Sequence, residues 1–139
     1  MKPEDLAKPN TEHAHQVALF CWAAQNREKH PELKWMFAIP NGGERNIAVA
    51  SRLKAEGVRS GVSDIFLPCA RGMNFGLFIE MKKPTDKEKK QRAGKESDKQ
   101  IEFGQHVSEQ GYLYAVCYTW EEARRTIEWY MDRTQTVAK

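Results

Sequence analysis

The chain has 139 residues, of which 40% are hydrophobic and 29% are charged, and its formal net charge is +3. This is the composition of a soluble globular domain, and so mild a positive charge does not by itself indicate a nucleic-acid partner. No apolar run approaches the roughly 20 residues of a membrane span, residues 1–10 lack a signal peptide's apolar centre, and three scattered cysteines without CxxC spacing are typical of reduced thiols. We therefore expect a cytoplasmic protein with no membrane partner.

The first predicted helix begins near residue 11, after an expected flexible tail over residues 1–10, and runs to about residue 29. Glu12 and Gln16 are four residues apart and share one face of this helix, which by itself indicates only ordinary surface. His13 and His15 suggest a zinc site, but residues two apart on a helix point to opposite sides. We therefore reject them as a ligand pair.

A short apolar strand is predicted over residues 35–39, and the sequence Pro-Asn-Gly-Gly at 40–43 ends it. This segment is either a simple turn or a loop whose backbone amides face a phosphate, with Arg45 close behind it. The next helix is expected over residues 47–56, with Asn46 as its N-cap and a glycine after its end. The loop residues that would face the phosphate are Asn41, Gly42 and Gly43.

Two apolar strands, Val62–Pro68 and Phe75–Met81, are predicted to form a hairpin around a turn that contains Gly72. If the strands pair symmetrically about this glycine, Asp64 lies opposite Glu80 on one face of the sheet. Two carboxylates with Cβ atoms roughly 5 Å apart repel each other unless a divalent cation binds between them.

The plain alternative is that Asp64, Glu80 and Lys82 are ordinary polar residues at strand ends. The apolar neighbours of both carboxylates argue against this, because they make the strands look central and buried, and buried charges need partners. Lys82 lies two residues after Glu80 and shares its face, whereas Lys83 points to the other face.

A basic run follows, because residues 82–99 carry eight Lys or Arg against four Asp or Glu. Residues 84–97 have almost no apolar side chain and are expected to form a flexible loop. The loop is either a solvated surface segment or a basic arm that lies on phosphates without reading sequence. In the second case its contacts would come from Lys83, Lys87, Lys89, Lys90 and Arg92.

Ser97 and Gln100 form a capping-box pattern that opens a helix over residues 98–110. Gln100 is therefore either a helix cap, a residue that orients a phosphate, or both. A strand over residues 112–118 follows, and then a helix to about residue 133, for which Thr119 and Glu122 suggest another capping box. The remaining residues, 134–139, are expected to form a C-terminal tail.

The strand–helix–strand order after the hairpin requires a parallel strand pair, whereas the hairpin is antiparallel. We therefore expect an α/β fold with a central mixed β-sheet flanked by helices, in one domain over residues 11–133.

Five segments in this order resemble the PD-(D/E)xK nuclease signature in its virus-type replication-repair nuclease (VRR-NUC) variant. They are Glu12 with Gln16, Pro40–Gly43, Gly61–Ile65, Ile79–Lys82 and Ser97–Gln100. The resemblance extends from about Glu12 to Glu122. This sequence has Val-Ser where the family has a proline before the aspartate, which alters the turn rather than the ligand set.

The resemblance implies a restriction-endonuclease-like fold and Mg²⁺- or Mn²⁺-dependent hydrolysis of a DNA phosphodiester. It implies that Glu12 approaches the metal, directly or through water, and that Gln100 is catalytic. Lys82 would position the attacking water or neutralise developing charge. The expected metal ligands are Asp64, Glu80, the backbone carbonyl of Met81, and Glu12.

Small free-standing members of this family are often phage-encoded, resemble Holliday-junction resolvases and act as homodimers. The resemblance therefore implies branched or flapped DNA as substrate, a homodimer, and a host bacterial cytoplasm if the chain is phage-encoded. Two other functions stay open: a non-catalytic DNA-binding accessory protein and a restriction endonuclease. The expected DNA contacts comprise the phosphate-facing loop, the basic run and Gln16.

Overall fold

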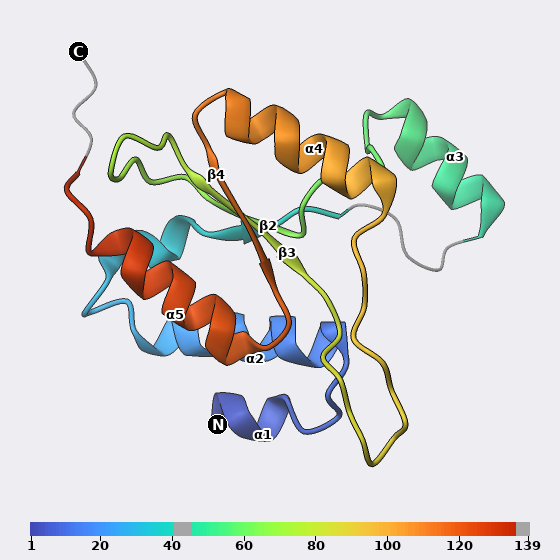
Figure 1. Ribbon diagram of the computed structural model, residues 1–139, viewed down its shortest axis with the longest axis horizontal. Helices are drawn as coiled ribbons and strands as arrows, with labels where there is room; N and C mark the ends of the chain where they lie inside the picture. The colour runs from blue at the N-terminus through green and yellow to red at the C-terminus, as the bar shows by residue number, and fades with distance from the viewer. Residues whose placement is uncertain (41–45, 136–139) are drawn as a thin grey trace.

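A computed structural model describes residues 1–40 and 46–135 of the chain. Its four-stranded sheet has the order β1-β2-β3-β4 (Figure 1). The first three strands are antiparallel neighbours, and β4 runs parallel to β3. The mixed sheet confirms the predicted fold class. The strands are β1 (Phe37–Ala38), β2 (Ile65–Leu67), β3 (Leu77–Met81) and β4 (Leu113–Cys117).

The hairpin between β2 and β3 has the predicted register. Ile65 pairs with Ile79 and Leu67 with Leu77, which centres the hairpin on Gly72. Gly72 has φ of +54° and the next residue, Met73, has φ of +74°. Positive φ at both central residues suits a two-residue hairpin turn, which Arg71 and Asn74 close. This closing pair is one residue out of step with the strand pairs, so the turn alone does not set the register of β2 and β3.

Helices cover both faces of the sheet. Alternate strand residues, among them Ile65 and Ile79, belong to the buried cluster that also contains side chains of α2 and α5. The other face meets α4, where the rings of Phe78 and Phe103 pack edge to face at 5.3 Å. The helices are α2 (Glu12–Gln25), α4 (Asp98–Glu109) and α5 (Trp120–Met131).

The N-terminal segment differs from the expected flexible tail. Residues Pro3–Leu6 form a short helix, α1, which lies beside α2 (Figure 1). Pro3 is buried, and Ala7 is part of the hydrophobic core. The apolar groups in this segment are few, but they find a partner in α2, and tertiary burial outweighs weak local preference.

The segment before β1 also differs from the prediction. Residues Pro31–Trp35 form a 3₁₀ helix, η1, so the expected strand over residues 35–39 is reduced to the two residues of β1. Leu33 is 2% exposed and anchors η1 in the core. Burial of one leucine on a helical turn thus competes with strand pairing.

Three helices begin at side-chain N-caps, of which Asn46 and Thr119 were predicted. The side chains of Thr11, Asn46 and Thr119 each accept a hydrogen bond from the backbone amide three residues later. The second capping box is incomplete, because the carboxylate of Glu122 lies 3.5 Å from the hydroxyl of Thr119 and not on its amide. Helix α2 ends at Gln25 rather than near residue 29. The next residue, Asn26, donates a hydrogen bond from its side-chain amide to the carbonyl of Trp22 at this end of the helix.

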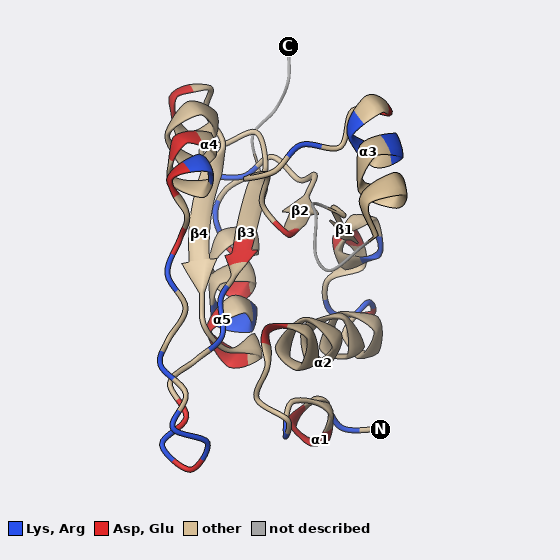
Figure 2. Ribbon diagram, turned by 90° about the vertical axis from the view of Figure 1, so that its right-hand side faces the viewer, with Lys and Arg blue, Asp and Glu red and all other residues tan. Residues whose placement is uncertain are grey.

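Helix α3 (Ile47–Ala55) begins at the predicted position and contains no buried residue. It stands away from the sheet on the side that also carries the start of α2 (Figures 1 and 2). None of the described helices is long and apolar enough to span a membrane. The loop residues Asn41, Gly42, Gly43 and Arg45, predicted to contact DNA, lie outside the described residues.

Candidate active site

Asp64 and Glu80 meet at one end of the β2–β3 hairpin, as the register requires. Asp64 precedes β2, and its Oδ2 accepts a hydrogen bond of 2.7 Å from the backbone amide of Met81. This bond continues the strand ladder through a side chain, so it fixes the carboxylate of Asp64 against β3. Glu80 lies beside it and is only 1% exposed.

The two oxygens of Glu80 have different surroundings. Oε1 accepts a hydrogen bond of 2.6 Å from Nε2 of Gln100 and lies 3.6 Å from Nζ of Lys82. Oε2 is buried, and no described residue donates a hydrogen bond to it. A buried carboxylate oxygen without a donor is costly in a folded protein, and such exceptions often mark a site for an ion or a catalytic role.

The pKa values of both carboxyl groups are raised. Burial, followed by the negative charge of Asp64, raises the pKa of Glu80 to about 8. Burial also raises the pKa of Asp64, and its hydrogen bond from Met81 and the positive charge of Lys82 act against this rise. A pair of this kind holds two negative charges close together only when a cation offsets them.

Gln100 caps α4, as one of its two predicted roles requires, and it also contacts Glu80. Its Oε1 accepts a hydrogen bond of 2.7 Å from the amide of Ser97, and the hydroxyl of Ser97 accepts one of 3.2 Å from the amide of Gln100. These two bonds form the predicted capping box of α4. The remaining amide group of Gln100 donates to Glu80, so the start of α4 orients the buried carboxylate.

Tyr114 and Glu96 were not identified from the sequence. The hydroxyl of Tyr114 donates a hydrogen bond of 2.6 Å to Glu96 and lies 3.5 Å from the carbonyl of Gln100. Burial and then the hydrogen bond to Glu96 raise the pKa of Tyr114, so its hydroxyl stays a donor. Gly104 makes room for the ring, because a Cβ there would lie 2.6 Å from a ring carbon. The pairing of Tyr114 with Phe78 places it on the face of Glu80, a register that local sequence does not reveal.

A cleft of about 490 Å³ opens beside Asp64, between α2 and the hairpin. Glu12 and Gln16 face it, as their shared helix face predicts, and the charge of Glu12 contributes to the raised pKa of Asp64. The cleft is lined by Glu12, His13, Gln16, Val17, Phe20, Asp64 and Met81.

The two histidines of α2 lie on different sides, as predicted. His13 faces the cleft, whereas His15 is 4% exposed and accepts a hydrogen bond of 3.0 Å from the amide of Trp120 on its Nδ1. Its Nε2 lies 2.7 Å from Oδ1 of Asn10. His15 therefore links α2 to the first turn of α5 and has a structural role.

The carboxylate oxygens of the site are the kind of ligand that a divalent cation such as Mg²⁺ prefers. Residues 1–40 and 46–135 contain no group of three or more His, Cys, Asp or Glu side chains placed to hold a metal together. They do contain the buried Glu80 beside the partly buried Asp64, with one oxygen of Glu80 left without a donor. Mg²⁺ commonly takes one or two protein carboxylates and keeps several waters, so this pair fits such an ion.

The basic loop over residues 84–97 leaves the hairpin directly after the site. Four basic side chains of this loop are exposed, and we call them the arm cations: Lys87, Lys89, Lys90 and Arg92. The backbones of Asp86 and Gln91 pair with each other, and Asn10 donates a hydrogen bond of 2.8 Å to the carboxylate of Asp86. The tip of the loop carries the blue and red segments furthest from the sheet in Figure 2. Lys89 donates a hydrogen bond to the carbonyl of Pro9, and Gln91 donates one to the carbonyl of Asn10, so the distal turn of the loop is attached to the N-terminal segment.

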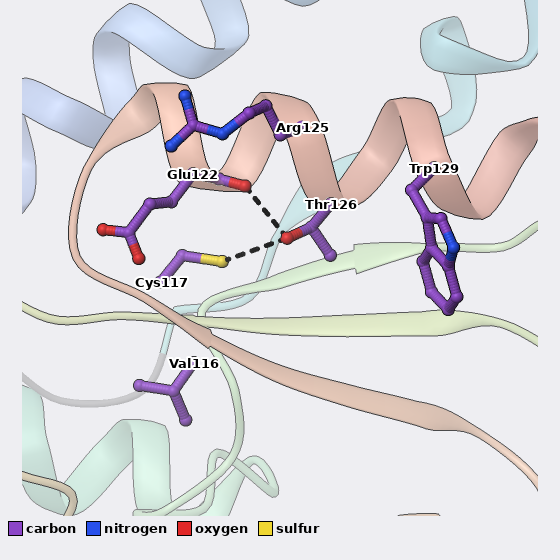
Figure 3. A pocket seen from close by; sticks show the side chains of 6 residues that line it. All are labelled: Val116, Cys117, Glu122, Arg125, Thr126 and Trp129. Carbon is purple, nitrogen blue, oxygen red and sulfur yellow. Dashed lines mark hydrogen bonds between the residues drawn. The ribbon is translucent and has the colours of Figure 1, made fainter.

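A second hollow, of about 340 Å³, lies between β4 and α5, and its lining includes neither Asp64 nor Glu80 (Figure 3). Cys117 lies there, with its sulfur 3.8 Å from the hydroxyl of Thr126. Burial raises the pKa of Cys117 to about 11, so this thiol is not a nucleophile at neutral pH.

A mixed sheet whose antiparallel hairpin brings an aspartate beside a Glu-x-Lys sequence defines the PD-(D/E)xK class of nucleases. The sequence matches the VRR-NUC domain over residues 10–120, and the chain belongs to this nuclease family. Its members act on DNA, so a DNA-hydrolysing activity follows from the family.

Comparison with solved structures agrees on the fold. A structure of a "VRR_NUC domain protein" superposes with a TM-score of 0.72 and 23% sequence identity, covering 90% of this chain and 91% of the other. No curated protein matches the chain.

Proposed function

We propose that this protein is a divalent-metal-dependent endonuclease that cleaves branched or flapped DNA. The observation that carries the proposal is the pair of Asp64 and Glu80: no described residue donates to the buried Oε2 of Glu80, and the partly buried Asp64 lines an open cleft. Binding of DNA alone does not need paired carboxylates, which repel phosphates. This argues against a non-catalytic accessory protein.

The cation would be Mg²⁺ or Mn²⁺, held by the carboxylates of Asp64 and Glu80 and by the backbone carbonyl of Met81. Glu12 would complete the site through a water molecule, since it faces the same cleft but belongs to no cluster of three ligands among the described residues. When bound, such an ion lowers the pKa of a coordinated water and offsets charge on the scissile phosphate.

The other residues of the site would hold the reacting groups in place. Nζ of Lys82 lies 3.6 Å from Oε1 of Glu80, and Lys82 would neutralise the charge that develops on the phosphate or position the attacking water. An ammonium group is too basic to act as the general base unless it is strongly desolvated. Gln100 fixes the orientation of Glu80 through its hydrogen bond of 2.6 Å.

DNA would be held mainly through its backbone. The four exposed arm cations and Lys83 would contact phosphates further along the DNA, and Gln16 faces the cleft. The amides of Asn41, Gly42 and Gly43, with Arg45, would contact a further phosphate. The nuclease domain would comprise residues 11–133, and a homodimer in the cytoplasm would suit a branched substrate with two-fold symmetry.

The proposal is tested with the purified wild-type protein and a panel of end-labelled DNAs of matched sequence: linear duplex, single strand, 5′ flap, 3′ flap and four-way junction. We expect cleavage of branched substrates in Mg²⁺ or Mn²⁺, weaker cleavage of duplex, and none in EDTA. Cleavage that persists in EDTA contradicts the metal site. Equal cleavage of duplex and branched DNA contradicts the structure selectivity alone, and binding without cleavage in either metal supports the accessory protein.

A further inference from the structure

We propose that the apolar part of the cleft beside Asp64 binds the sugar and base of one unpaired nucleotide next to the scissile phosphate. This inference rests on the proposed function and names a binding site within it. It gives a physical reason for the preference for branched DNA.

The wall of this cleft is a single stripe of α2. Its residues follow a spacing of one, three, one and three positions from Glu12 to Phe20, which keeps them on one face of a helix. The stripe is acidic at the end near the carboxylate pair and apolar two turns later. A ligand that spans it would therefore place a charged group at one end and an uncharged group at the other.

The apolar end of the cleft is accessible to solvent, and its aromatic side chain is held in place. Val17 is 39% exposed although it belongs to a helix packed on the core. Phe20 is partly buried and packs against the core cluster, so its ring is held in place while its side toward the cleft is accessible. Aromatic rings held in this way are the usual stacking partners of single-stranded bases.

The charges of the cleft select against a second phosphate. Its described lining contains the carboxylates of Glu12 and Asp64 and no Lys or Arg. The other polar groups are His13 and Gln16, which can form hydrogen bonds at a sugar or a base edge. The neutral part of a nucleotide suits this environment, and a phosphate does not.

The size of the cleft agrees with this occupant. A volume of about 490 Å³ lies within the range of pockets that enclose a small organic ligand. A base that is stacked and paired in a duplex cannot enter such a pocket, whereas a base at a junction or flap leaves its stack at little cost. The pocket thus favours DNA whose strand is unpaired beside the cleavage position.

The first test uses the Asp64→Asn variant, which should bind DNA without cleaving it, and flap or junction DNA with 2-aminopurine at single positions around the cleavage position. We expect binding to raise the fluorescence at one flanking nucleotide, because that base leaves its DNA neighbours, and no change at positions further away. An unchanged signal at every flanking position overturns the subsite.

The second test compares Phe20→Ala with Phe75→Ala, since Phe75 is 59% exposed and precedes β3 at the end opposite Glu80. Phe20→Ala should weaken binding of branched DNA about tenfold, as for the loss of one stacked base, and binding of plain duplex less than twofold. The Phe75→Ala protein should match the wild type on both DNAs. Equal losses for Phe20→Ala on both DNAs overturn the subsite.

The nucleotide subsite and the nuclease activity can be refuted separately. If the wild type cleaves DNA with Mg²⁺ but neither test shows an unpaired nucleotide, the subsite is wrong and the nuclease stands. If the wild type cleaves none of the panel with Mg²⁺ or Mn²⁺, the proposed function fails and the subsite with it.

Discussion

Glu80→Gln should stabilise the metal-free protein at alkaline pH, because Glu80 is buried beside another carboxylate. The substitution keeps the side-chain volume and the acceptor for Gln100, and the new amide can donate toward Asp64. The pKa of Glu80 is raised from 4.5 to about 8, so its contribution to stability is complete below pH 4.5 and is lost as the pH rises through about 8.

The magnitude follows from this rise. At about 1.4 kcal/mol for each pH unit, ionisation of Glu80 removes up to about 4 kcal/mol of folding free energy between pH 5 and pH 9. The neighbouring Asp64 can take up the proton in its place, so we expect a loss of about 2–4 kcal/mol in the wild type, and none of it in the variant.

Urea denaturation in EDTA at pH 5 and pH 9 measures this difference directly. The wild type and Glu80→Gln should diverge as the pH rises, and Mg²⁺ should restore the wild type at pH 9 without affecting the variant. The control is Glu102→Gln, which removes the same charge from an exposed position of α4 and should follow the wild type. A constant difference between wild type and Glu80→Gln at both pH values refutes the coupling of the two carboxylates.

Three further predictions concern other parts of the protein. Lys82→Ala should lower single-turnover cleavage in saturating Mg²⁺ by about a hundredfold, because Lys82 lies beside Glu80. Lys83→Ala should cost little turnover, and equal losses for the two variants contradict these roles. Replacement of the four arm cations by Ser should weaken binding alike on all sequences and flatten the salt dependence by up to about one unit per lost phosphate contact, and an unchanged salt slope makes the loop plain surface. Gly104→Ala should lower the free energy of unfolding by about 1–3 kcal/mol in urea denaturation, because its Cβ would lie 2.6 Å from the ring of Tyr114, and a stabilised variant contradicts this packing.

The centre of the fold was readable from the sequence because its determinants are local. Two apolar strands on either side of a turn that contains Gly72 predict the hairpin, and the register of the strands places Asp64 opposite Glu80. The capping box at Gln100 was equally local. Its second bond, to Glu80, depends on how α4 lies over the sheet, and sequence spacing does not contain that information.

The parts that sequence reasoning missed depend on contacts between distant segments. Tyr114 reaches the site through the register of β3 with β4, which is set by the packing of a whole crossover. Helix α1 and the 3₁₀ turn η1 are ordered by burial of Pro3 and Leu33 rather than by local preference. Glu12 was assigned to the site by resemblance alone, and the structure places it on the cleft that Asp64 also lines.

The most direct test of the central claim is cleavage of one branched DNA by the wild type and by Asp64→Asn, measured under single-turnover conditions in Mg²⁺ together with DNA binding. We expect the variant to lose cleavage and to bind the DNA as tightly as the wild type or more tightly, because it has lost a charge that attracts the metal and repels phosphate. Near-normal cleavage by Asp64→Asn would contradict the assignment of Asp64 and Glu80 as the metal site.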